Sequence, residues 1–352
     1  MRRVTTFVAL AASAALGLSA CGGGSSAGTP AATDSSAPST SAAPAVKVGL
    51  AYDIGGRGDK SFNDAAAAGL DKAKTELGVE IKELEATGGE TDAAKEERLR
   101  LLADGGYSPV IGVGFAYAAA LKKVAAEFPQ TKFAIVDDAS FEAPNVANLV
   151  FAENEGSFLV GVVAAQASKT GNVGFIGGVN VPLIKKFEVG FAAGAKAVNP
   201  AITVQVKYLT EPPDFSGFGD PAKGKTAAQG MLDGGADVIY AAAGGSGSGA
   251  FDAVAAKKGT WAIGVDSDQY LTAAPAVQPV IVTSMLKRVD VAVFNEVKSA
   301  VDGTPLSGIQ TFDLKADGVG YSISNPAVAP FTAKVDEFKA KIISGEIKVA
   351  EK

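Results

Sequence analysis

From residue 47 onward, the chain alternates short apolar runs with longer, alanine-rich segments whose apolar positions recur at helical spacing. The apolar runs predict strands at 47–53, 79–86, 109–114, 132–138, 172–178, 202–209, 237–243 and 261–266. The segments between them predict helices at 61–77, 91–104, 117–128, 182–198, 221–233 and 247–258. Strands that are apolar almost throughout are typical of parallel sheets covered by helices on both faces. The pattern therefore predicts a doubly wound α/β fold.

The number of strand–helix units predicts two lobes, because four units precede residue 150 and four follow it. An almost wholly apolar helix at about 156–168 is expected to be buried where the chain crosses between the lobes. We assign 46–150 and about 281–305 to lobe 1, and 151–280 and about 306–352 to lobe 2. Open α/β sheets bind ligands beyond the carboxyl ends of their strands. We therefore expect a ligand cleft between the lobes, formed by residues at the strand ends.

The first 45 residues differ in composition from the rest of the chain. A basic start and an apolar stretch at 5–18, too short to span a membrane, predict a signal peptide over 1–20. Residues 18–21, Leu-Ser-Ala-Cys, resemble a bacterial lipobox, and this resemblance implies cleavage before Cys21 and a lipid on that cysteine. An ordinary secretory signal followed by an incidental cysteine is the alternative. Residues 21–45, rich in small residues and proline, predict a flexible tether. We expect a protein on the extracytoplasmic face of the cell membrane, attached through its lipid alone.

The composition excludes several classes of function. The chain has no histidine and one cysteine, which excludes Ser–His and Cys–His catalysis, zinc sites of the usual kind and disulfides within the chain. We expect no catalytic residues, no metal and no cofactor, although chemistry by carboxylates stays open. The net charge is −6 at pH 7, and −8 once Arg2 and Arg3 are removed, which argues against nucleic acid as a partner. We expect a monomer.

Carboxylates recur at the predicted strand ends. Asp53 ends the first predicted strand, Asp137 and Asp138 end the fourth, and Asp266 ends the eighth. Lys287 follows a later apolar run, and a glycine-rich turn occupies 244–249. Several aspartates with one lysine at a cleft favour a neutral ligand that carries hydroxyl groups and nitrogen. The alternative for any one aspartate is a helix N-cap.

Two phenylalanines lie near predicted helix starts. Phe62 follows a glycine-rich turn, and Phe187 lies in the first turns of the helix at 182–198. One ring from each lobe would enclose a flat ligand ring when the cleft closes. The alternative is that both are core aromatics. Ser61 is expected to cap the first helix, so that Phe62 and Asn63 point into the cleft.

Long motifs, in order from Lys47 to about Ser344, resemble the basic membrane protein family, the PnrA-like nucleoside-binding lipoproteins of ABC importers. They include GGRGDKSFN, FPQTKFAIVDD, NVANLVFAENEGSFLVGVVAA, GNVGFIGGVNVPLIKKFEVGFAAGAKAVNP, DPAKGKTAAQGMLDGGADVIYAAAGGSGSG, WAIGVDSDQ and VTSMLKRVDVAVFNEV. The resemblance implies a type I periplasmic-binding-protein fold and a purine nucleoside in the cleft. It also implies a permease and an ATPase as partners.

The resemblance assigns roles to residues of this chain. The aromatic residues that stack on the base correspond to Phe62 and Phe187, and the residues that contact its edge correspond to Asn63 and Asp137, with Asp138 adjacent. The ribose contacts correspond to Asp266, Lys287 and the backbone at Gly244 and Gly245. Asp53 lies at the cleft without a definite role. The chain departs from the family pattern in a longer loop, YLTEPPDFSGFGDPAKGK at 208–225, and in Gly-Arg-Gly at 56–58. These departures leave the contacts at the cleft rim, and the preferred ligand, open.

Two other readings of the cleft stay open. A sugar receptor of the same fold would also use aspartate, asparagine and aromatic faces. A nucleoside hydrolase would use aspartate as its base.

Two short motif matches are rejected. GDPAKGKT at 219–226 satisfies a phosphate-loop pattern, but the preceding strand ends near Leu209 and Pro221 removes a needed N–H donor. The tripeptide RGD at 57–59 is interpreted as a coincidence.

Overall fold

The computed structural model describes residues 45–352. The predicted signal peptide, the lipidation site Cys21 and all but the last residue of the predicted tether lie outside the described residues. Within 45–352, no helix is both long enough and apolar enough to cross a membrane.

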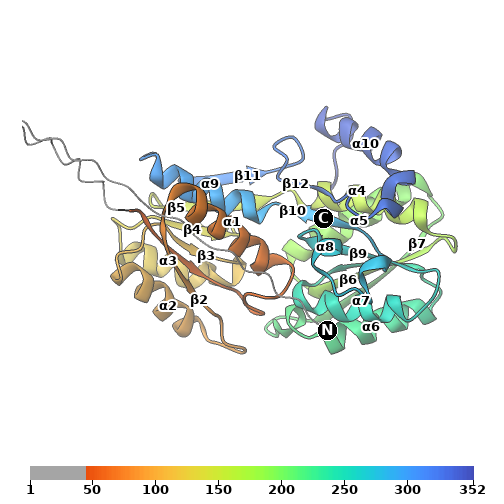
Figure 1. Ribbon diagram of the computed structural model, residues 1–352, viewed down its shortest axis with the longest axis horizontal. Coiled ribbons are helices and arrows are strands. Elements are labelled where there is room, and N and C mark those ends of the chain that lie inside the picture. Colours follow the sequence, from red (N-terminus) through yellow and green to blue (C-terminus); the bar gives the residue numbers. More distant parts are fainter. Residues whose placement is uncertain (1–44) are drawn as a thin grey trace, which may run out of the picture. The chain divides into compact units, whose positions relative to one another are not determined.

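Lobe 1 is built on a parallel six-stranded sheet with the strand order β11–β5–β4–β3–β1–β2 (Figure 1). Its strands are β1 (Lys47–Ala51), β2 (Glu80–Leu84), β3 (Val110–Gly112), β4 (Phe133–Val136), β5 (Val146–Phe151) and β11 (Gly308–Phe312). Its helices are α1 (Phe62–Leu77), α2 (Asp92–Asp104), α3 (Ala118–Glu127) and α9 (Val289–Val301). The central strands β1, β3 and β4 are almost wholly buried, because helices cover both faces of a doubly wound sheet.

Lobe 2 repeats this arrangement with the strand order β12–β10–β9–β8–β6–β7. Its strands are β6 (Asn172–Val179), β7 (Thr203–Thr210), β8 (Val238–Ala242), β9 (Trp261–Asp266), β10 (Ile281–Lys287) and the antiparallel β12 (Val319–Tyr321). Its helices are α4 (Glu153–Ala167), α5 (Pro182–Val198), α6 (Pro221–Asp233), α7 (Gly247–Ala255), α8 (Gln269–Thr272) and α10 (Ala329–Ile343). The prediction of two α/β lobes with parallel sheets is confirmed.

The structure corrects the predicted division of the C-terminal part. β10 was assigned to lobe 1, but it pairs with β9 in the sheet of lobe 2, and the helix after it, α9, packs against α1 of lobe 1. β11 was assigned to lobe 2, but it pairs in parallel with β5 in lobe 1. The local pattern predicts only that a segment is extended. The choice of sheet depends on the pairing partner, which for β11 is a strand about 160 residues earlier in the chain.

Within residues 45–352 the chain passes between the two sheets after β5, after β10 and after β11. Two of the charged residues at these crossings face each other, Glu153 directly after the first crossing and Lys287 at the second. Both side chains are almost fully buried. The crossings therefore bring an acidic and a basic group together between the lobes.

The helix α4 is buried on nearly all sides, as predicted. It packs closely along α5, where a Cβ atom at Gly194 would lie only 2.0 Å from the carbonyl oxygen of Phe158. Because no side chain fits in that space, glycine is required at this position for the two helices to approach.

Candidate ligand-binding site

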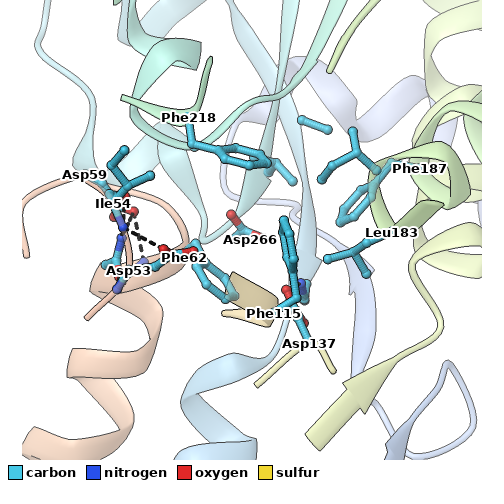
Figure 2. A pocket seen from close by; sticks show the side chains of 16 residues that line it. Asp53, Ile54, Asp59, Phe62, Phe115, Asp137, Leu183, Phe187, Phe218 and Asp266 are labelled. Carbon is cyan, nitrogen blue, oxygen red and sulfur yellow. Dashed lines mark hydrogen bonds and ion pairs between the residues drawn. The ribbon is translucent and has the colours of Figure 1, made fainter. Parts of the chain in front are cut away.

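The carboxyl ends of strands from both sheets meet around one pocket (Figure 2), and its empty volume of about 520 Å³ includes space open to solvent. Asp53, Asp137, Gly244, Asp266 and Lys287, which follow or end β1, β4, β8, β9 and β10, line it. The strand ends of both lobes therefore form a single candidate binding site.

The structure brings most of the predicted site residues together. Those that line the pocket are Asp53, Phe62, Asn63, Asp137, Phe187, Gly244, Asp266 and Lys287. Gly245 does not line it, although a Cβ atom at this position would lie 3.5 Å from Phe218 O and 3.8 Å from Asp59 Cβ. Asp138 does not line it either, and its carboxylate accepts hydrogen bonds from the main-chain N–H and the hydroxyl of Ser140.

Lys287 lies at the centre of the charged groups. Its ammonium group donates a hydrogen bond to Asp137 and lies 3.7 Å from Glu153 Oε1. The ring centroids of Phe62 and Phe187 lie 4.9 and 5.6 Å from the same nitrogen. Burial alone lowers the pKa of Lys287, but the carboxylates of Asp137, Glu153 and Asp266 have the larger effect and raise this pKa above its ordinary value. Lys287 is therefore a charged donor inside an aromatic pocket.

The two acids that end β4 and β9 have left-handed backbone conformations. Asp137 has a φ of +68° and Asp266 a φ of +64°. Non-glycine residues adopt this region rarely and at an energetic cost, and such residues cluster at functional sites. These conformations turn both carboxylates into the pocket where the strands end (Figure 2).

The buried acids of the site hold their protons more tightly than acids in water. Burial raises the pKa of Asp53 to about 7, that of Glu153 to about 7 and that of Asp266 to about 6. Burial also raises the pKa of Asp137, although Lys287 opposes it. Asp137 Oδ1 and both carboxylate oxygens of Glu153 have no hydrogen-bond partner. Near neutral pH, the pocket can therefore both accept and donate hydrogen bonds.

Sequence reasoning missed the aliphatic residues of the pocket wall and three residues with aromatic or charged side chains, Asp59, Phe115 and Phe218. Figure 2 shows the rings of Phe115 and Phe218 at the pocket together with that of Phe62. Phe115 follows the carboxyl end of β3, so the strand-end rule would have identified it. Phe218 comes from the long loop after β7, whose path no local pattern indicated.

Asn63 is engaged by its own loop. Its Oδ1 accepts the main-chain N–H of Asp53 at 3.0 Å, and its Nδ2 donates to Ile54 O at 3.3 Å and to Asp59 Oδ2 at 3.0 Å. Both amide hydrogens are thus used to hold the loop that carries Asp53. Its contact with a ligand base stays a prediction, and the observed bonds favour a role in shaping the pocket wall.

Ser61 is the N-cap residue of α1 as predicted, but the predicted capping hydrogen bond is not made. Asp59 accepts the main-chain N–H groups of Asn63 at 2.9 Å and Asp64 at 3.1 Å instead. The carboxylate can reach the first turn from two residues upstream, and the hydroxyl of Ser61 is thereby free to contact Asp266.

The fold and the pocket define the class of the protein. Two α/β lobes joined by three crossings, with a pocket at their facing strand ends, form the type I periplasmic-binding-protein fold, which the Lac repressor shares. Within residues 45–352, no group of three or more acidic, histidine or cysteine side chains is arranged to hold a metal ion.

Comparison with known proteins gives the family. The model of the family described as "ABC transporter substrate-binding protein PnrA-like" matches residues 45–352. The chain belongs to this Bmp family, as its motifs indicated, and it is a solute-binding protein of the ABC transporter type.

Individual relatives agree with this assignment. The "CD4+ T-cell-stimulating antigen" of Listeria monocytogenes is 38% identical over 87% of this chain and 88% of its own length. The "ABC transporter nucleoside-binding protein BmpA" of Lactococcus lactis is 34% identical over 87% of this chain and 89% of its own length. A solved ABC transporter solute-binding protein from Aeropyrum pernix superimposes with a TM-score of 0.75 at 32% identity, covering 87% of this chain and 94% of that one.

Proposed function

We propose that this protein is the lipid-anchored, extracytoplasmic receptor of an ABC importer and that it binds purine nucleosides by closure of its two lobes. The observation that carries the proposal is one pocket that unites Phe62 from lobe 1 and Phe187 from lobe 2 with Asp137, Asp266 and Lys287. The relative from Lactococcus lactis whose name describes it as nucleoside-binding supports the same class of ligand.

The aromatic and acidic walls suit a purine base. Stacking of a base on an aromatic side chain contributes roughly 1–3 kcal/mol, and Phe62 and Phe187 are the rings we assign to it. Asp53 and Asp137 offer carboxyl groups to the N–H groups at the edge of the base. Because burial raises the pKa of Asp53 to about 7, this residue also donates a hydrogen bond when it is protonated.

The ribose is assigned to the lobe 2 side of the pocket. Asp266 accepts hydrogen bonds from ribose hydroxyl groups, and Lys287 donates one to a sugar oxygen. Gly244 has a φ of +54° and no side chain, so the main chain approaches the sugar closely at this turn.

The charge of the pocket disfavours phosphate groups. Among the residues that line it, Asp53, Asp59, Asp137 and Asp266 are acidic and Lys287 is basic. Lys287 is already paired with Asp137, so a phosphate would meet an excess of negative charge. We therefore propose nucleosides rather than nucleotides as ligands.

The closed, loaded receptor would deliver its ligand to a permease driven by a separate ATPase, while the lipid on Cys21 keeps it at the membrane. We assign no catalytic residues. A sugar receptor is the second candidate in the same class, and a nucleoside hydrolase is the candidate from another class.

Titration calorimetry with adenosine, guanosine, inosine, cytidine and free ribose tests the proposal. We expect the purine nucleosides to bind and free ribose not to bind. Tight binding of ribose without binding of any nucleoside would identify a sugar receptor. Release of free base during a long incubation with a nucleoside would identify a hydrolase.

A further inference from the structure

Apart from a long contact of the Ser61 hydroxyl with Val265 O at 3.4 Å, three hydrogen bonds join the loop before α1 in lobe 1 to the end of β9 and the start of α8 in lobe 2. The hydroxyl of Ser61 donates to Asp266 Oδ2 at 2.6 Å. The main-chain oxygen of Ser61 accepts from Ser267 Oγ at 3.0 Å, and that of Lys60 accepts from Gln269 Nε2 at 2.9 Å. We call these three bonds the interlobe latch.

Each half of the latch is held in place by its own lobe. In lobe 1, Asp59 Oδ1 accepts the main-chain N–H of Ser61 at 2.9 Å. In lobe 2, Gln269 Oε1 accepts the main-chain N–H of Val265 at 2.9 Å, and the main-chain N–H of Gln269 donates to Ser284 Oγ at 3.1 Å. Each half is therefore held by its own lobe, and the two halves bond to each other directly.

The latch lies where water competes little. Ser61 is fully buried, Gln269 is 4% exposed and Asp266 is 7% exposed. A hydrogen bond to a buried, ionised group contributes more than one between neutral, solvated groups. Among the three bonds, the one from Ser61 to Asp266 therefore contributes most to keeping the lobes together.

Ser61 also acts on the binding site without lining it. Asp266 lines the pocket, whereas its donor Ser61 belongs to the opposite lobe and lies outside the lining. Because the two residues are in different lobes, the hydroxyl reaches the carboxylate only when the lobes are close. The bond holds a carboxylate whose backbone is in the left-handed conformation.

We propose that Ser61 is a positioning residue that couples lobe closure to ligand binding: its hydroxyl takes one oxygen of Asp266 as the lobes close and orients the other toward a ligand hydroxyl group. The proposal rests on the proposed function, because it takes a ribose hydroxyl as the group that Asp266 receives. Because the latch bonds join the lobes directly, we expect them to favour closure whether or not a ligand is bound.

The coupling has an electrostatic signature. Asp266 faces Lys287 of β10, Asp137 of β4, Asp59 before α1 and Tyr240 of β8. Burial raises its pKa to about 6, while Lys287 and the hydrogen bond from Ser61 favour its ionised form. Removal of the hydroxyl therefore raises the pKa of Asp266 further. Affinity, which needs the ionised carboxylate, is then lost at a higher pH as the solution is acidified.

The dissociation constant for adenosine, measured by calorimetry between pH 5 and 8, tests this coupling in Ser61→Ala. We expect binding roughly tenfold weaker at pH 7 and a higher pH at which affinity falls. Ser267→Ala removes a latch bond that does not involve Asp266, so the pH at which affinity falls is expected to stay as in the wild type. Ser344→Ala, on the surface, is expected to match the wild type in both affinity and pH dependence. A Ser61→Ala variant with wild-type affinity and pH dependence would overturn the proposal. So would a Ser267→Ala variant with the same shift in pH dependence.

Small-angle X-ray scattering of the empty proteins gives a readout that needs no ligand. We expect a larger radius of gyration for Ser61→Ala and Ser267→Ala than for the wild type, with thermal unfolding confirming that each variant is folded. Identical scattering of the three empty proteins would overturn the latch. If the wild type binds no nucleoside, the proposed function fails, while this comparison still decides whether the latch holds the lobes.

Discussion

The ammonium group of Lys287, at the end of β10 in lobe 2, donates a hydrogen bond to the carboxylate of Asp137, at the end of β4 in lobe 1. The two side chains are 2% and 5% exposed, and Glu153 lies 3.7 Å from the same ammonium group. Removing one partner of such a buried pair leaves an uncompensated charge in a medium that solvates it poorly. The pair therefore connects the two lobes and the ligand pocket through a single interaction.

Replacing this lysine by an apolar residue is expected to weaken the fold as well as ligand binding. Lys287→Met should lower the free energy of unfolding by about 3 kcal/mol at pH 8. The loss should be smaller at pH 5, where Asp137 and Glu153, whose pKa values burial raises, take up protons more readily. Urea unfolding at both pH values measures the difference. Lys298→Met, which breaks a half-exposed pair with Asp302, should cost about 1 kcal/mol or less. Equal losses for the two variants would contradict the buried pair.

Asp266→Asn separates ligand affinity from stability. Asparagine keeps the shape of the side chain and tolerates the left-handed backbone, so the fold should be retained. Nucleoside affinity should fall roughly 10- to 100-fold, because a charged acceptor is replaced by a neutral amide. The matched control is Asp237→Asn, a buried aspartate that accepts hydrogen bonds from Ser168, Lys169 and Thr170. Asp237→Asn should lower the melting temperature with little change in affinity, and the reverse pattern would refute the ribose assignment.

The long loop after β7 supplies an aromatic contact across the cleft. Phe215 of this loop meets Phe115 of lobe 1 with ring centroids 5.8 Å apart and an interplanar angle of 66°. An edge-to-face pair contributes roughly 0.5–1.5 kcal/mol, so Phe215→Ala should weaken nucleoside binding a few-fold through faster dissociation. Stopped-flow release of ligand measures that rate. Phe294→Ala, whose ring lies against Lys72 within lobe 1, should leave it unchanged.

Glu296 of α9 should make the fold less stable as the pH rises. It is fully buried, neither carboxylate oxygen has a hydrogen-bond partner, and burial raises its pKa from an ordinary value of 4.5 to about 8. Between these two pH values the folded protein keeps a proton on Glu296 that the unfolded chain releases. The contribution of this group to the free energy of unfolding therefore falls as the pH rises from 5 to 8. Glu296→Gln should remove this pH dependence. The free energy of unfolding of the variant should exceed that of the wild type by about 2–4 kcal/mol at pH 8 and by little at pH 5. Unfolding curves of the two proteins at pH 5 and 8 that stay parallel would contradict the prediction.

The close approach of α4 and α5 makes Gly194 irreplaceable. A Cβ atom there would lie 2.0 Å from Phe158 O, so Gly194→Ala should destabilise the protein by about 2–3 kcal/mol. Gly230 in α6 has no atom within 4 Å of its Cβ position. Gly230→Ala should therefore stabilise the helix by about 0.5–1 kcal/mol. Denaturant unfolding of these two variants tests the contact between α4 and α5. If Gly194→Ala leaves the free energy of unfolding unchanged, the two helices are able to move apart.

Much of the candidate site was predictable from strand ends. Asp53, Asp137 and Asp266 were identified because parallel strands present their carboxyl ends at one edge of a sheet. Phe218 was not, because it enters the pocket from a loop whose path depends on contacts with distant residues such as Gly178. The role of Asn63 was equally hidden, since its hydrogen bonds depend on how the loop from Asp53 to Asp59 folds back on it.

By itself, the sequence determined the class of the fold, the positions of most helices and strands and the residues at the strand ends. Apolar periodicity and turn residues reflect interactions over a few positions, so helices and strands can be predicted from them without knowledge of the whole chain. Only the tertiary structure decided that β10 joins lobe 2 and β11 joins lobe 1, and that Ser61 bonds to Asp266 rather than capping its own helix. Such pairings arise between residues up to about two hundred positions apart, where burial and the competition for hydrogen-bond partners choose among alternatives that are locally equivalent.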